Sequence, residues 1–276
     1  MIDNMLKRFP GGTDDDRQQA LREVMQEITL AGLYRAGFFE KAAFYGGTCL
    51  RIFHGLSRYS EDLDFSLLKL NPDFRWQPYL DAVQTEFKAL GVDVSIREKI
   101  KSNKTTIESA FLKNETSVTT LEFSRIRVKI KLEIDTQPPL GFATEELLLI
   151  EPFSCYVKCF SLPDLYAGKL HAVLYRQWKH RVKGRDWYDF IWYTSRRIAV
   201  NEQMLAAALA QTGPWAGTGQ PVDRLWCLRA IEDKIKSIDW RRAREDVRAF
   251  VRQVELPSLD LWSRDFFLAQ ASKLPE

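Results

Sequence analysis

Two aspartates and a glycine-rich turn form the strongest chemical signal in the chain. Asp62 and Asp64 stand one residue apart in the apolar stretch DLDFSLL, and Gly46, Gly47 and Thr48 precede them by a short amphipathic segment. Because successive side chains of a β-strand alternate between its two faces, both carboxylates project from the same side. Two adjacent carboxylates repel each other unless a cation lies between them, and a hard cation such as Mg2+ suits oxygen ligands. The turn offers backbone N–H groups and a helix N-terminus to phosphate groups.

Each part of this pattern has an ordinary alternative. A glycine pair before a helix is common, and Gly11, Gly12 and Thr13 form a second GGT that leads only into the aspartates of a helix start. A half-exposed edge strand can also carry two acids on its solvent face. The combination of strand, glycine turn, helix and Asp-x-Asp is more specific than either part, and it favours a site for a metal ion and phosphates.

A second polar strand face is predicted further along the chain. In residues 126–135 apolar and polar side chains alternate strictly. The polar face carries Arg127, Lys129, Lys131, Glu133 and Asp135. If this strand lies beside the Asp-x-Asp strand, one of its two acids becomes a third metal ligand, and we favour Glu133 over Asp135. The alternative is a half-solvated strand with cross-strand ion pairs.

The elements that must position these residues change type along the chain. Strands and helices are mixed up to about residue 160, and Pro138, Pro139 and Gly141 are expected to end the sheet. Helices are expected from there on, over 163–177, 186–196, 202–210, 223–237, 240–254 and 259–271. We therefore predict a bilobed α+β fold, with a mixed-sheet domain at 1–160 and an α-helical domain at 161–276.

Composition excludes several classes of protein. No stretch of the 276 residues approaches the roughly 18 apolar residues of a membrane helix, and the first residues lack a signal-peptide core, so we expect a cytoplasmic protein without membrane contact. The four cysteines form no disulfide framework or zinc pattern and are expected to be buried thiols. Residues 156–276 carry 20 Lys and Arg against 14 Asp and Glu, so positive charge gathers in the second half.

The motifs together resemble a known enzyme family. GGT, then LR, then RYSEDLDF look like the signature of the AbiEii/MenT nucleotidyltransferase toxins, a branch of the DNA polymerase β-like nucleotidyltransferase superfamily. LPDLYAGKL at 162–170 and KGRDWYD at 183–189 are similar to the later lysine and Arg-Asp motifs of that family. The resemblance spans residues 42–193, and the mixed-then-helical layout agrees with the bilobed fold of the family.

The resemblance implies an activity, cofactors and partners. The reaction would be the transfer of a nucleoside monophosphate from an NTP, with Mg2+ or Mn2+, to an acceptor, while pyrophosphate leaves. Members of that family are toxins of type IV toxin–antitoxin or abortive-infection systems, and some add pyrimidine nucleotides to tRNA 3′ ends. Their usual partner is an AbiEi-type antitoxin encoded nearby. Phosphoryl transfer depends on positioning and charge neutralisation, which suits Asp62, Asp64 and a third acid around two metal ions.

The resemblance also extends the list of site residues. Lys169 is assigned to the triphosphate, although without the family match a surface lysine would be the better interpretation. Asp186 is expected in the catalytic set with Asp62, Asp64 and Lys169, and its alternative is an ordinary helix N-cap. The metal ligands would be Asp62, Asp64 and Glu133. The nucleotide-binding residues would be Gly46, Gly47, Thr48, Arg51, Ser60, Lys169 and Arg176.

A basic stretch ahead of Asp186 suggests where an RNA acceptor could bind. Cationic side chains accumulate between residues 176 and 185 without an acid among them, and Trp178 lies inside the run. Such a stretch can hold a phosphate backbone and stack a base, whereas the alternative is a solvated loop. The expected RNA contacts are Lys179, Arg181, Lys183 and Arg185.

Two other functions stay open at this point. The same fold could modify a small molecule, such as an aminoglycoside or a lincosamide, or a protein side chain instead of RNA. A non-catalytic regulator that binds nucleotide or nucleic acid is the alternative from another class, and the intact pair Asp62 and Asp64 argues against it.

Overall fold

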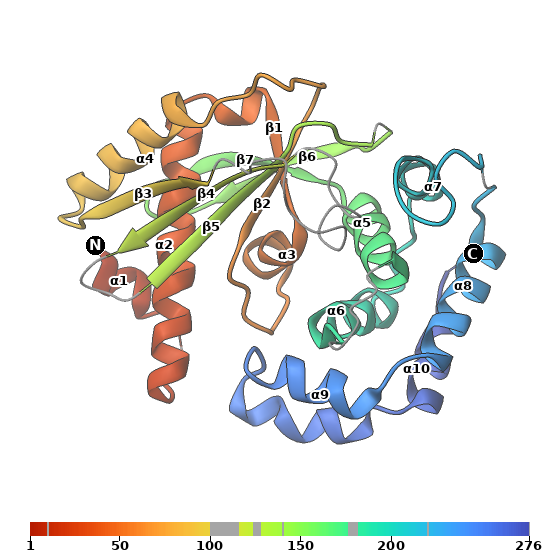
Figure 1. The fold of residues 1–276 in the computed structure, drawn as a ribbon. Coiled ribbons are helices and arrows are strands. Elements are labelled where there is room, and N and C mark those ends of the chain that lie inside the picture. The colour runs from red at the N-terminus through yellow and green to blue at the C-terminus, as the bar shows by residue number, and fades with distance from the viewer. Residues whose placement is uncertain are drawn as a thin grey trace.

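A mixed β-sheet forms the centre of the N-terminal part of the chain (Figure 1). The computed structural model describes residues 1–9, 11–99, 116–123, 128–139, 141–175, 182–219 and 221–275. Within these ranges the sheet has seven strands in the order β3-β4-β5-β2-β1-β7-β6. The strands are β1 Ala42–Tyr45, β2 Leu63–Leu67, β3 Val94–Lys99, β4 Thr116–Phe123, β5 Val128–Asp135, β6 Thr144–Leu149 and β7 Cys155–Phe160.

The central strands β2 and β1 are antiparallel, and each has a parallel neighbour on its other side. β5 pairs with β2, and β7 pairs with β1. Leu63 and Phe65 of β2 lie opposite Leu132 and Ile134 of β5, and all four side chains are fully buried. The alternation predicted for this second strand is therefore confirmed over its described part, and so is its position beside the Asp-x-Asp strand. The predicted hairpin is also present, because β4 and β5 pair antiparallel.

Helices α1 and α2 precede the first strand along the chain, and α3 and α4 follow β1 and β2. They span Ile2–Leu6, Asp14–Arg35, Gly46–His54 and Gln77–Ala89. α2 begins at Thr13, whose hydroxyl accepts the Asp16 N–H while the Asp16 carboxylate accepts the Thr13 N–H, so the second GGT is a helix start as predicted. α2 is buried on all sides between residues 24 and 33, because it packs against both the sheet and α4. The two helices approach closely at Gly32, where a Cβ atom would lie 2.8 Å from Val83 Cα.

The remaining helices lie together on one side of the sheet in Figure 1, with α9 below α3 and α6. They are α5 Leu162–Tyr175, α6 Gly184–Ser195, α7 Glu202–Gln211, α8 Arg224–Lys236, α9 Trp240–Arg248 and α10 Arg264–Ala271, with 3₁₀ segments at Phe38–Glu40 and Gln253–Leu261. The α+β class is thus confirmed, while the division into two lobes at residue 160 stays a prediction. Among the described helices, none is both long and apolar enough to cross a membrane.

Two predictions about the elements are wrong. The sheet does not end at Pro138, because β6 and β7 follow and β7 pairs with β1. The helix predicted over 240–254 ends at Arg248, and the helix predicted from residue 259 begins only at Arg264. Pro257 lies between them in a 3₁₀ segment, as expected for a residue without a backbone N–H to donate. The four cysteines are free and buried, as predicted.

Candidate active site

Three carboxylates lie on the face of the sheet opposite its aromatic core. Asp64 belongs to β2 and Asp62 immediately precedes it, while Leu63 and Phe65 between and beyond them are buried. Glu133 of β5 is the register partner of Asp64, so the two side chains share one face. Asp135 is instead the partner of Ser66, one step further along the strand. The register therefore brings Glu133, rather than Asp135, beside the Asp-x-Asp pair.

The glycine turn fits closely against the segment that carries the aspartates. Gly46 has φ +84°, which favours glycine, and a Cβ atom there would lie 2.7 Å from Asp64 Oδ2. A Cβ atom on Gly47 would lie 2.6 Å from Arg58 Nη2 and 3.2 Å from Ser60 Oγ. Glycine is thus favoured at residue 46 by its backbone conformation, and at residue 47 by the close approach of the Arg58 side chain. They also open α3, whose first N–H groups have no partner within the helix and can receive an anion.

Two side chains fix the loop that leads into β2. Thr48, only 1% exposed, donates its hydroxyl to the Asp62 carbonyl oxygen. Gln26 of α2 donates its amide to the carbonyl oxygens of Ser60 at 3.2 Å and Glu61 at 3.0 Å. The Thr48 hydroxyl therefore joins the glycine turn to the aspartates, and the predicted contact of Thr48 with nucleotide would have to come from its backbone.

Burial and the neighbouring acids disfavour the ionised form of Asp62. Burial raises the pKa of Asp62 to about 6, and the neighbouring charges of Asp64, Glu133 and Glu61 add to the shift, while Lys131 opposes it. Lys131 forms an ion pair with Glu133. In the described part of the chain no three His, Cys, Asp or Glu side chains are grouped to hold a metal ion together. The all-oxygen donors Asp62 and Asp64 fit a hard divalent cation, whereas Glu133 is engaged by a lysine.

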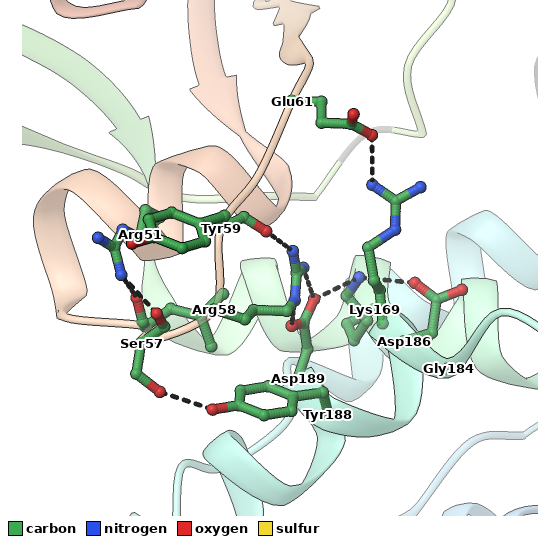
Figure 2. A network of polar contacts seen from close by, with 12 residues as sticks. Arg51, Ser57, Arg58, Tyr59, Glu61, Lys169, Gly184, Asp186, Tyr188 and Asp189 are labelled. Carbon is green, nitrogen blue, oxygen red and sulfur yellow. Dashed lines mark hydrogen bonds and ion pairs between the residues drawn. The ribbon is translucent and has the colours of Figure 1, made fainter. Parts of the chain in front are cut away.

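A buried network of charges lies on the helical side of the site (Figure 2). Lys169 of α5 donates to Asp186 Oδ1 at 2.8 Å and contacts Asp189 Oδ2 at 2.7 Å. Arg58 binds both oxygens of Asp189, from Nε and Nη2, at 2.6 Å each. Asp186 and Asp189 belong to α6, and Arg58 belongs to the loop before β2. The predicted residues Lys169 and Asp186 are thus brought together, one turn away from a second aspartate.

Opposite charges outweigh burial in this network. Burial alone would raise the pKa of Asp189, but Arg58 and Lys169 hold it below its usual value. Burial alone would lower the pKa of Arg58, and Asp189 raises it instead. Asp186 is not a helix cap, because α6 begins at Gly184 and Lys183 occupies the N-cap position. The N-cap alternative for Asp186 is therefore wrong.

Sequence reasoning missed Arg58 and Asp189 as members of the site. Both stand inside the motifs RYSEDLDF and KGRDWYD, but their pairing joins residues that are 131 positions apart. Asp189 follows Asp186 by three residues, which places the two carboxylates on neighbouring positions of one helix face. This spacing of three residues is the feature of the sequence that could have identified Asp189 as a second carboxylate of the site.

Other predicted residues are engaged elsewhere or lie outside the described ranges. The Arg51 guanidinium donates to Glu23 at 2.8 Å and to the carbonyl oxygens of Leu56 and Ser57, so a contact with nucleotide would have to break these bonds. Arg185 is 16% exposed, donates to Glu61 at 3.2 Å and lies over the Phe250 ring. Residues outside the described ranges are Arg176, Lys179 and Arg181.

Comparison with known proteins assigns the chain to a family. A family model described as nucleotidyl transferase AbiEii toxin, type IV TA system, matches residues 28–270. A candidate nucleotidyltransferase from H. pylori has 18% identity and a TM-score of 0.48, with 90% of this chain and 91% of that chain covered. JHP933 from Helicobacter pylori has 18% identity and a TM-score of 0.43, with 90% and 88% covered. No curated protein matches the chain.

The family match runs from the last third of α2 into α10 and includes all seven strands of the described sheet. It includes the glycine turn, both aspartates of the Asp-x-Asp strand and the network around Lys169. The expectation from the sequence motifs is therefore confirmed at the level of family and enzyme class. This chain belongs to the AbiEii nucleotidyltransferase toxins of type IV toxin–antitoxin systems, and is a nucleotidyltransferase.

Proposed function

We propose that this nucleotidyltransferase uses a divalent cation, Mg2+ or Mn2+, to transfer a nucleoside monophosphate from an NTP to an RNA acceptor, the 3′ end of a tRNA. The observation that carries the proposal is the position of Asp62 and Asp64 beside Glu133, directly against the glycine turn that opens α3. At such a short distance the carboxylates can bind the metal ion of a metal-bound triphosphate, while the N–H groups of the helix N-terminus bind its phosphates.

Different residues of the chain would have different roles in the reaction. Asp62 and Asp64 would hold the cation, and the N–H groups at Gly46 and Gly47 would bind the triphosphate. A bound cation would supply charge neutralisation for the phosphates and would favour ionisation of the acceptor hydroxyl. The acceptor hydroxyl would lose its proton to solvent, and its oxygen would form a bond to the α-phosphorus while the bond from the α-phosphorus to the pyrophosphate oxygen breaks. Lys169 supplies positive charge to the phosphates from the helical side.

The RNA acceptor and the antitoxin belong to the same proposal. The excess of positive charge after residue 156 favours a polyanionic acceptor, and Lys183 and Arg185 stand at the start of the helix that carries Asp186. The type IV description of the family implies an antitoxin partner, and we expect it to be an AbiEi-type protein encoded nearby. Such an RNA is found in the cytoplasm, the compartment that the sequence also predicts.

The test is a transfer assay with purified protein, total tRNA, Mg2+ and each labelled NTP in turn. We expect label on tRNA with at least one NTP, its loss when Mg2+ is chelated, and its loss in Asp64→Asn. Asp73→Asn is the matched control, because Asp73 is exposed in the loop after β2. If wild-type protein labels no RNA with any NTP, the RNA acceptor is wrong, and label on protein would point to a different acceptor.

A further inference from the structure

The geometry points to Asp189 as the positioning residue of Lys169, and to Arg58 as the group that sets Asp189. We propose that Arg58 and Asp189 together hold Lys169 of α5 at a fixed distance from the glycine turn at Gly46 and Gly47. The inference rests on the proposed role of Lys169 in nucleotidyl transfer.

Asp189 has little freedom to move. Its side chain is 0% exposed, and its two oxygens receive Arg58 Nε and Nη2 at 2.6 Å each in a two-point contact. Oδ2 also lies 2.7 Å from Lys169 Nζ. A two-point Arg–carboxylate contact fixes the plane of the carboxylate as well as its position. The Lys169 amine is therefore held between Asp189 and Asp186, with its side chain only 13% exposed.

Arg58 joins this cluster to the glycine turn. Its Nη2 atom lies 2.6 Å from the position that a Cβ atom of Gly47 would occupy, and its Nη1 donates to the Tyr59 carbonyl oxygen at 2.9 Å. The Tyr59 N–H in turn donates to the Phe250 carbonyl oxygen at 2.8 Å, beyond the end of α9. A single guanidinium thus packs against the turn and binds α6, and Figure 2 shows it between the loop and Asp189.

The charges explain why Arg58 is needed. Lys169 faces two carboxylates, Asp186 and Asp189, and with both uncompensated its charge would be more than cancelled. Arg58 neutralises Asp189 and Lys169 balances Asp186, so the cluster carries no net negative charge that would repel an incoming triphosphate. A buried ion pair is by itself weak evidence for stability, because apolar residues of similar volume often serve as well. The contact with a lysine of the site is what gives this pair a role in positioning.

The central variant is Asp189→Asn, which keeps the shape of the side chain and removes its charge. We expect kcat for nucleotidyl transfer to fall about 100-fold, as for a misplaced reacting group, with a much smaller change in the KM for NTP. We also expect the Lys169 amine to react faster with an acylating reagent, measured by mass spectrometry of the labelled peptide. This second readout needs no nucleotide and no acceptor.

Asp189→Asn leaves Arg58 buried without its partner, so a loss of stability must be separated from a loss of positioning. The double variant Arg58→Met/Asp189→Asn removes both charges and should regain most of the lost Tm. We expect its kcat to stay low and Lys169 labelling to stay fast. Val83→Ala is the destabilised control, because it truncates a fully buried side chain of α4 that packs against Gly32 of α2, away from the site, and it should lower Tm without changing Lys169 labelling.

Three results would overturn the proposal. Recovery of kcat together with Tm in the double variant would show that the pair is only structural. Unchanged Lys169 labelling in Asp189→Asn would show that Asp189 does not hold the lysine. Faster Lys169 labelling in Val83→Ala would show that destabilisation alone exposes the amine. If wild-type protein transfers no nucleotide to RNA, the proposed function fails, while the labelling experiment still decides the role of Asp189.

Discussion

Replacing Asp62 by Asn should stabilise the metal-free protein at neutral pH. Burial and the neighbouring acids Asp64, Glu133 and Glu61 raise the pKa of Asp62 from 3.8 to about 6. A shift of about two units corresponds to roughly 3 kcal/mol at about 1.4 kcal/mol per unit. Because Asp62 is only half-buried and partly screened by solvent, we expect an effect of about 2 kcal/mol.

The sign of the pH dependence follows from the direction of the shift. The folded state binds the Asp62 proton more tightly than the unfolded state, so the stability that this proton gives is fully present below pH 3.8. It is lost as the pH rises through about 6. Asp62→Asn cannot ionise and keeps its stability. The two proteins should therefore be similar near pH 4 and diverge towards pH 7, with the variant more stable.

Thermal unfolding in EDTA between pH 4 and 7.5 measures this difference. An effect of about 2 kcal/mol corresponds to a Tm higher by about 4 to 8 °C in a protein of this size. Asp73→Asn, an exposed carboxylate, is the control and should follow wild type throughout. Adding Mg2+ should reverse the order, since a ligand at 100 times its Kd stabilises by about 2.7 kcal/mol and the variant loses a ligand oxygen.

Two outcomes would refute this reasoning about Asp62. A variant that is no more stable than wild type at pH 7 in EDTA would show that its carboxylate is not under electrostatic stress. A difference in Tm that is the same at pH 4 and pH 7 would show that the stabilisation comes from something other than the charge.

Two further predictions concern the same site. Gly46→Ala should abolish transfer in the tRNA assay while the protein stays folded, because its Cβ atom would lie 2.7 Å from Asp64 Oδ2 and φ is +84°. Retained activity would show that the turn can move away from Asp64. Lys131→Met should tighten Mn2+ binding measured by electron paramagnetic resonance, because it releases Glu133, and Lys129→Met, on the same strand face but paired with another acid, should not. Equal effects of the two variants would indicate a general change in charge.

The sequence predicted the parts of the site that depend on local periodicity. Alternation with a period of two placed Asp62 and Asp64 on one side of a strand and predicted the polar face of the neighbouring strand. The helix start at Thr13 was also recognisable, because a capping box involves residues only three positions apart. In each case the physical cause acts within a few residues, so the pattern is complete in the sequence.

Contacts between distant segments could not be predicted in the same way. Arg51 stands in the matched motif and was assigned to the nucleotide, yet its partner Glu23 is on another helix. Its role depends on how α2 packs, which no local pattern encodes. The same limit hid the pairing of Arg58 with Asp189. The strands β6 and β7 were missed because they follow a segment rich in proline and glycine, which is a usual signal for the end of a sheet.

The loop that delivers Asp62 depends on both the sheet and the helical part of the chain. From the helical part, Tyr188 OH hydrogen-bonds with Ser57 Oγ at 2.6 Å, and Asp189 binds Arg58. From the N-terminal part, Gln26 and Thr48 bind carbonyl oxygens of the same loop. The loop before the aspartates is therefore held from both parts of the chain. This dependence gives a physical reason why the family match extends through the helices instead of ending with the strands.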